Sequence, residues 1–206
     1  WRSSRPELAS GRRVWICASA IGWYGDRGSE TLTEDAAPGS GFLADVCREW
    51  EAASRPAEEL GVRAANLRFG MVLSPVGGAL KAMLPVFKFG LGGPIGPGTQ
   101  YMSWIAIDDA VRAIHYAGDN KSIQGPVNVA APQPVTNSEF AKSLAHALGR
   151  PAFMRVPAFA VRLALGEMGE ALLLSSTRAI PAKLEERGFK FHFPALRPAL
   201  DHLLTT

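Results

Sequence analysis

The sequence is poor in cysteine and has no long apolar run. Its 206 residues contain only two cysteines, Cys17 and Cys47, too few to form a disulfide framework for a chain of this size. No uninterrupted apolar stretch approaches the roughly 18–20 residues that a membrane-spanning helix needs. These absences favour a reduced, cytoplasmic protein with no membrane partner, in which both cysteines pack as small apolar side chains.

An excess of charge of one sign is also absent. Lys and Arg number 22 against 19 Asp and Glu, which gives a formal net charge of +3, and Arg12–Arg13 is the only adjacent basic pair. Such a distribution lacks the clustered footprint of a nucleic-acid-binding surface. The four histidines stand at no spacing typical of metal ligands, so the sequence predicts no metal site.

The apolar pattern predicts an α/β fold. Residues 12–19 form a short apolar run that ends in small residues, as in a buried parallel strand. Residues 40–60 have helical periodicity, interrupted by Pro56, where we expect a kink or break. Residues 61–69 read as the next strand. Strand, helix and strand in this order predict a βαβ unit with parallel strands.

The rest of the chain is predicted to leave the sheet and return to it once. We expect a helix over 79–89, a strand over 101–107, a helix to about 117 capped by Asp108 or Asp109, and a strand over 125–129. From Thr136, which with Glu139 fits a capping box, the pattern is mostly helical, with further helices over 157–165, 171–175, 181–186 and 195–204. The sequence thus predicts two parts: residues 1–76, which belong to the sheet domain, and residues 77–206, which form a substrate-side and helical lobe. Residues 108–130 of the second part are expected to return to the sheet.

No stretch matches the Gly-x-Gly-x-x-Gly phosphate loop of dinucleotide-binding domains. The nearest candidate, residues 90–98 (GLGGPIGPG), has its glycines at other spacings. Pro94 and Pro97 also prevent a helix from beginning there. We therefore expect a structural or substrate-side loop rather than a pyrophosphate cradle.

Several segments nevertheless resemble one superfamily. They are SAIGWYGD at 19–26, LRFGMVL at 67–73, GLGGPIG at 90–96, WIAIDD at 104–109, and the Phe-x-x-x-Val-Cys-x-x-Trp-Glu helix at 42–51. Together they resemble the epimerase-like branch of the extended short-chain dehydrogenase/reductase superfamily. The resemblance implies the second half of a Rossmann-type doubly wound sheet plus a small, mostly helical C-terminal lobe. It also implies NAD or NADP as cofactor and a small-molecule substrate, with nucleotide sugars as one candidate class.

The resemblance places the cofactor at the ends of two strands. Ala18 and Ser19 end the first strand, where ligands bind in open α/β sheets. By resemblance Ser19 matches the active-site serine of the superfamily; an alignment shifted by one residue would place that position at Ala20. By resemblance, Gly70, Met71 and Val72 match positions whose backbone groups contact the nicotinamide half of the cofactor. The alternatives are a strand-end serine that satisfies local backbone groups and ordinary strand-to-loop packing.

The acid–base pair of the superfamily is missing. Its members carry Tyr-x-x-x-Lys on a helix, where the lysine lowers the pKa of a tyrosine that exchanges a proton with the substrate. Aligning Trp50 and Glu51 with that helix puts Leu43 at the tyrosine position and Cys47 at the lysine position. Tyr24 is a candidate replacement acid; the alternative for it is aromatic packing in its loop.

Two further expectations concern how the chain packs. Arg68, with apolar neighbours, is predicted to form a structural ion pair rather than a phosphate site. Trp15, Trp23, Trp50 and Trp104 are predicted to fill the core and the interface between lobes.

The absent phosphate loop predicts about a hundred further residues before Trp1, and that residues 1–206 alone bind neither NADH nor NADPH well. A half sheet would leave an unpaired strand edge, which favours homo-oligomers. The alternative function is a non-catalytic nucleotide sensor or a cell-division-associated interaction protein.

Overall fold

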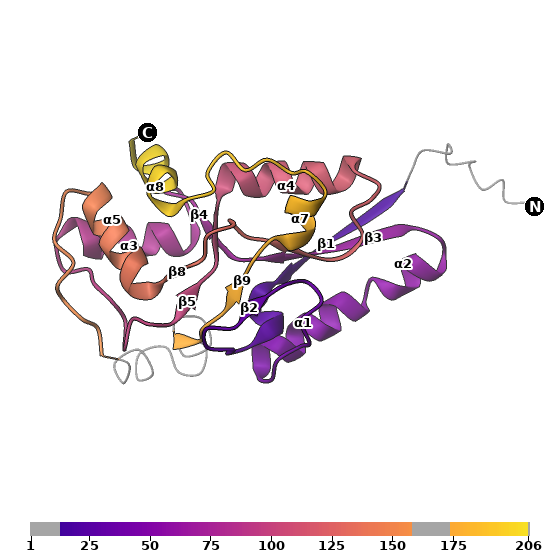
Figure 1. The fold of residues 1–206 in the computed structure, drawn as a ribbon, viewed down its shortest axis with the longest axis horizontal. Helices are drawn as coiled ribbons and strands as arrows, with labels where there is room; N and C mark the ends of the chain where they lie inside the picture. Colours follow the sequence, from indigo (N-terminus) through magenta and orange to yellow (C-terminus); the bar gives the residue numbers. More distant parts are fainter. Residues whose placement is uncertain (1–12, 158–173, 206) are drawn as a thin grey trace, which may run out of the picture.

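Three parallel strands form the centre of the molecule (Figure 1). The computed structural model of the chain describes residues 13–157 and 174–205. The strands β1 (Val14–Ala20), β3 (Arg63–Phe69) and β7 (Gly125–Val129) pair in the order β1-β3-β7. The predicted strands are confirmed, as is the return of the chain to the sheet at β7. The chain is thus an α/β protein with a parallel sheet, as expected.

Two helices cover one face of β1 and β3. The predicted helix over 40–60 is divided into α1 (Phe42–Ala52) and α2 (Arg55–Glu59), and Pro56 lies in the first turn of α2. Proline is tolerated there because the first turn has no intrahelical partner for its missing N–H. The predicted break is confirmed, and it falls just before the proline.

The opposite face of the sheet is apolar and packs against α4 (Ile107–Asp119) (Figure 1). Ala65 and Leu67 of β3 and Val127 and Val129 of β7 are fully or almost fully buried there. Three alanines of α4, Ala110, Ala113 and Ala117, face them at helical spacing. Their small side chains let the helix lie close to the strands, so this face is closed mainly by apolar contact, with Arg63 of β3 bonding to carbonyls at the end of α4.

A second apolar cluster lies at the far end of the molecule. Strands β4 (Met71–Leu73) and β6 (Trp104–Ala106) pair in parallel beside α3 (Gly78–Lys88), α5 (Asn137–Ala147) and α8 (Leu196–Thr205). The predicted capping box is confirmed: Thr136 accepts from the Glu139 N–H, and the Glu139 side chain accepts from the Thr136 N–H. These helices make up the described part of a mostly helical C-terminal half.

Short elements join the two ends. They are the 3-10 helix η1 (Ile21–Tyr24), the pair β2 (Thr31–Leu32) and β9 (Arg178–Ala179), the pair β5 (Tyr101–Met102) and β8 (Val135–Thr136), and α7 (Ala182–Glu186). The predicted strand over 101–107 is divided at Ser103, whose buried hydroxyl bonds to the backbone of Thr177 and Ala179. The helix predicted over 157–165 lies outside the described residues except for Pro157, as do residues 171–173 of the helix predicted over 171–175.

The prediction that Asp108 or Asp109 caps α4 is wrong. The N-cap residue is Ala106, without a side-chain cap, and both aspartates lie within the first turn. The fully buried Asp109 carboxylate instead accepts the backbone N–H groups of His192 and Phe193 and pairs with Arg112. It ties the C-terminal segment to α4, a role that no local sequence pattern reveals.

The prediction that the tryptophans fill the core holds only in part. Trp104 is fully buried, but Trp15 is 50 % exposed and Trp50 is 52 % exposed. Trp15 lies on β1, whose outer edge pairs with no other strand among the described residues. Trp50 lies on α1 and is half exposed, whereas the adjacent Glu51 is buried against the sheet.

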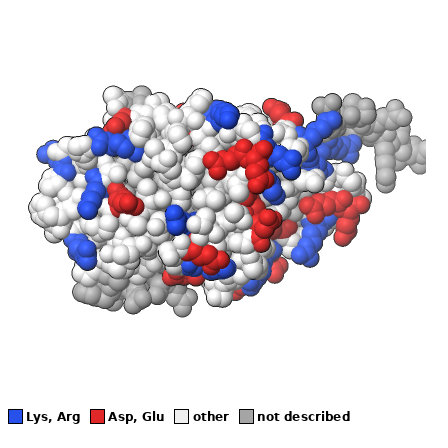
Figure 2. Space-filling view, in the orientation of Figure 1, with Lys and Arg blue, Asp and Glu red and all other residues white. Residues whose placement is uncertain are grey.

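The charged side chains are unevenly distributed over the surface. On the face shown in Figure 2, acidic side chains gather over the half that holds α1, α2 and α7, with basic side chains among them. Within the ranges that the structure describes, no helix is long and apolar enough to cross a membrane.

Candidate functional site

Three polar side chains stand in one row across the carboxyl-terminal half of the sheet. Ser19 of β1 is opposite Arg68 of β3, and Arg68 is opposite Asn128 of β7. Residues paired across a sheet point to the same face, so all three point to the face that α1 covers. All are buried, with exposed fractions of 4 %, 2 % and 0 %.

Glu51 of α1 binds two members of this row. Its carboxylate accepts hydrogen bonds from Nε and Nη2 of Arg68, each at 2.8 Å, and from the Ser19 hydroxyl, also at 2.8 Å. The two-pronged contact matches the planar guanidinium to the carboxylate. The predicted structural ion pair of Arg68 is therefore confirmed, with Glu51 as its partner.

Tyr24 joins Arg68 to Asn128. Its hydroxyl accepts from Nη1 of Arg68 at 3.0 Å and donates to Oδ1 of Asn128 at 2.7 Å. The Tyr24 side chain is fully buried, and burial raises its pKa above the ordinary value, against the opposing effect of Arg68. The guanidinium of Arg68 also lies 4.0 Å from the ring centroid of Trp23, a cation–π contact.

Glu34 closes the network from the loop after β2. Its Oε1 accepts the backbone N–H groups of Asn128 and Lys183, at 3.0 and 3.2 Å. Only 5 % of the residue is exposed, and this burial raises the pKa of its carboxyl group. We refer to Ser19, Glu51, Arg68, Tyr24, Asn128 and Glu34 as the polar network.

Sequence reasoning found Ser19, Tyr24 and Arg68 but missed Glu51, Asn128 and Glu34 as members. Asn128 was hidden inside an apolar strand, and Glu34 in a polar loop. Glu51 did carry a signal, since it stands four residues after the buried Cys47 and so on the same helix face. The structure brings Ser19 and Tyr24 into one network through Arg68, with both hydroxyls pointed into the protein.

The predicted cofactor segment lies beside this row, where the chain leaves β3. Gly70 donates its N–H to the carbonyl of Val129, and Met71 donates to the carbonyl of Ser103. A Cβ atom at Gly70 would lie 2.7 Å from the Ser103 carbonyl oxygen, so any larger residue would push the two chains apart. Gly70, Met71 and Val72 all remain partly exposed, and Ala18 is exposed at the end of β1.

Leu43 and Cys47 lie on the face of α1 that packs against η1. The Cys47 thiol is buried and donates weakly to the Ala20 carbonyl at 3.6 Å, while Leu43 packs against Gly22. A cavity of about 300 Å³ opens beside them, lined by η1, the first turn of α1 and Thr177. Leu43 itself carries no group that could exchange a proton, and Asp26 is the ionisable residue among those that line this cavity.

The glycine-rich stretch over 90–98 is a packing loop. A Cβ atom at Gly93 would lie 1.9 Å from the Met154 carbonyl oxygen, and the loop bonds to Val156 through Pro94 and Gly96. The glycines therefore serve close contact between two backbone segments. This geometry agrees with the structural alternative of the sequence prediction.

Comparison with known proteins gives one matched family and many similar chains. Residues 156–203 match a domain of unknown function, DUF1731. The chain is 45 % identical to an epimerase family protein of Mycobacterium leprae over 95 % of its own length and 64 % of that protein's. It is 39 % identical to epimerase family protein SDR39U1 of Mus musculus, over 96 % of its own length and 68 % of that protein's.

A solved structure is similar throughout. The human epimerase family protein SDR39U1, solved with NADPH, superposes with a TM-score of 0.89 at 33 % identity, over 94 % of this chain and 65 % of that one. The chain thus spans somewhat less than two thirds of the length of this neighbour and of the mycobacterial relative. From the identity shared with the mouse protein, its coverage and the common Rossmann-like sheet, the chain belongs to the SDR39U1-type epimerase family of the extended short-chain dehydrogenase/reductase superfamily.

Proposed function

We propose that this chain forms the nicotinamide-side and substrate-side part of an NAD(P)-binding oxidoreductase of the epimerase type. The observation that carries the proposal is the carboxyl-terminal edge of the sheet, where Ala18 and Gly70–Val72 remain accessible beside a buried, fully paired row of polar residues. Ligands of open α/β sheets bind at this edge. The human relative solved with NADPH supports the same cofactor class for this chain.

Small residues suit a flat ring at this edge. Ala18 and Gly70 leave the strand ends without bulky side chains, and Val72 offers an apolar contact. The bound nicotinamide would supply hydride transfer. The residues of this chain would position it, exclude water and hold the substrate in the cavity beside η1.

The polar network would act as a positioning device. Ser19 donates its proton to Glu51 inside the protein, and this hydrogen bond would hold the end of β1 in place beside the cofactor. For Tyr24 we favour the packing alternative over a role as acid, since its hydroxyl is buried between Arg68 and Asn128. Neither residue replaces the missing Tyr-x-x-x-Lys pair directly.

Replacement of that pair by Leu43 and Cys47 limits the chemistry. General acid–base help contributes about 10²–10⁴ in rate, so an enzyme without it needs a donor from the substrate or from outside this chain. We propose weak turnover on a small hydroxyl or carbonyl substrate, with sugars as the class that the family name suggests. A nucleotide sensor without turnover is the second candidate, favoured by the apolar wall at Leu43.

The test is an NMR titration of the natural full-length protein with NADPH and with NADH. The proposal predicts that the amide resonances of Gly70, Met71 and Val72 shift on binding, while that of Gly149, in an exposed turn, does not. Binding that leaves all three resonances unmoved would refute the assignment of this edge. A turnover screen with sugars and simple carbonyls then separates a weak enzyme from a sensor.

A further inference from the structure

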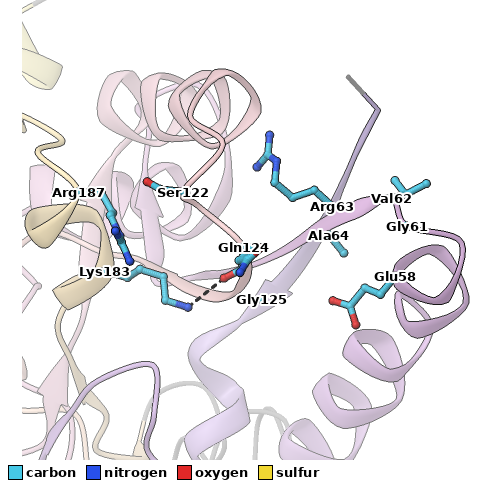
Figure 3. Close-up of a pocket in the computed structure, with 10 residues that line it drawn as sticks. All are labelled: Glu58, Gly61, Val62, Arg63, Ala64, Ser122, Gln124, Gly125, Lys183 and Arg187. Carbon is cyan, nitrogen blue, oxygen red and sulfur yellow. Dashed lines mark hydrogen bonds between the residues drawn. The ribbon is translucent and has the colours of Figure 1, made fainter. Parts of the chain in front are cut away.

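A second groove lies at the opposite, amino-terminal edge of the same sheet. Figure 3 shows its residues: Lys183 lies in α7 and Arg187 directly after it, Gln124 and Gly125 lie at the start of β7, Arg63 comes from β3, and Glu58 from α2. The groove has a volume of about 730 Å³. A smaller hollow of about 280 Å³ shares Glu58 and Gly125 with it and reaches inward to Trp23 and Asn66. We call the two together the amino-edge groove.

Two buried polar atoms at its inner end have no partner. The Oδ1 atom of Asn66 and the Nε1 atom of Trp23 are inaccessible to solvent, and neither makes a hydrogen bond. Asn66 is 5 % exposed, and its Nδ2 donates to the Ser54 hydroxyl at 3.1 Å. An unpaired buried polar group costs about 1–3 kcal/mol. Both atoms belong to residues that line the hollow, one an acceptor and the other a donor.

The outer end of the amino-edge groove is cationic. Its walls carry Arg63, Lys183 and Arg187, with Glu58 as the carboxylate opposite. Arg63 is held rigidly because it donates to the carbonyls of Ala117, Gly118 and Ile123. Lys183 donates to the carbonyls of Gln124 and Pro126, and Nζ has three protons, so one remains for a ligand.

We propose that the amino-edge groove binds a small organic phosphate, independently of the cofactor edge. The phosphate would lie among Lys183, Arg187 and the fixed charge of Arg63. The uncharged part would lie in the hollow beside Asn66 and Trp23, and a small shift of these two side chains would let it donate to Oδ1 of Asn66 and accept from Nε1 of Trp23. Nucleoside monophosphates have this chemistry, since uracil and adenine each present a hydrogen-bond donor beside an acceptor.

The test is calorimetric titration of the natural full-length protein with UMP, AMP, inorganic phosphate and uridine. UMP and AMP are expected to bind saturably, and more tightly than phosphate or uridine. Phosphate alone and uridine alone each fill only one end of the amino-edge groove. Arg187→Gln, an exposed substitution that leaves the fold intact, should weaken the binding about tenfold. Arg150→Gln, equally exposed but far from the groove, is the matched control and should leave it unchanged.

The inner end has its own variant. Asn66→Leu removes the acceptor, so it should weaken the binding of UMP and leave the binding of inorganic phosphate unchanged. A thermal melt checks that this variant, at a buried position, is folded. Addition of saturating NADPH should not displace UMP, which separates this site from the proposed cofactor edge. Kd values above about 1 mM for both nucleotides, or equal binding by Arg187→Gln and the unsubstituted protein, would overturn the proposal.

Discussion

The two faces of one short sheet are built on different principles. The face toward α4 is closed by apolar side chains such as Leu67 and Val127, whereas the face toward α1 carries Ser19, Asn66, Arg68 and Asn128. Apolar contact is non-directional and tolerates small shifts. Hydrogen bonds to a buried guanidinium fix distances and angles. The comparison indicates that the α4 face supplies stability and that the α1 face sets the geometry of the carboxyl-terminal edge.

The largest effect is expected from Glu51→Gln, which leaves Arg68 buried without a counter-charge. The free energy of unfolding should fall by about 3–5 kcal/mol, measured by urea denaturation. The exposed pair Arg197–Asp201 is the control, and Arg197→Ala should cost less than about 1 kcal/mol. A loss for Glu51→Gln no larger than for Arg197→Ala would show that the buried pair is dispensable.

On the apolar face, Leu67→Ala should reduce the free energy of unfolding by about 3 kcal/mol. The side chain is 1 % exposed, so its removal leaves a cavity against α4. Leu60→Ala, at a position that is 83 % exposed, should change the same quantity by less than about 0.5 kcal/mol. Equal losses at the two positions would mean that the α4 face is not closed as described.

Tyr24→Phe should cost less, about 1–2 kcal/mol. It removes one hydroxyl and leaves Oδ1 of Asn128 without its donor, while the ring still packs. Denaturation of Tyr24→Phe beside Tyr116→Phe measures this difference, because Tyr116 is only partly buried and its hydroxyl contacts the Arg187 carbonyl at the surface. A neutral Tyr24→Phe would remove the hydroxyl from the polar network.

The smallest effect is a pH dependence at Glu34. Because burial raises the pKa of this carboxyl group in the folded chain, the folded state binds the proton more tightly than the unfolded state. The unsubstituted protein should therefore lose stability relative to Glu34→Gln as pH rises from the ordinary value of 4.5 through the raised value. Denaturation curves across pH, with exposed Glu59→Gln as control, check the sign. A difference that grows toward acid instead would contradict it.

The apolar face could be predicted from the sequence, and the polar face only in part. Apolar runs predict strands such as the one over residues 61–69, and the local spacing of Thr136 and Glu139 predicts a helix cap. Asp109 misled the same reasoning, because its partners at 192 and 193 are distant in sequence. Glu34 and Asn128 were missed for that reason too, as they are 94 residues apart along the chain.

Trp15 shows the other limit of the sequence. An apolar residue in a strand indicates burial only if something covers that strand, and pattern alone does not say what lies over β1. Arg68 was placed correctly because its apolar neighbours predicted burial, and a buried arginine needs a counter-charge. The partner, Glu51, stands on a helix that the sequence predicts, but its pairing with Arg68 became clear only in the structure.

The most direct test compares the two faces through cofactor binding. Tyr24→Phe perturbs the α1 face and Val127→Ala the α4 face, and both are at fully buried positions. The dissociation constant for NADPH is measured for both in the natural full-length protein, at a temperature where both are folded. If the polar network sets the geometry of the cofactor edge, Tyr24→Phe raises the dissociation constant for NADPH by about tenfold or more, and Val127→Ala leaves that constant unchanged. Equal dissociation constants for the two variants, or a larger loss in Val127→Ala, would contradict the account.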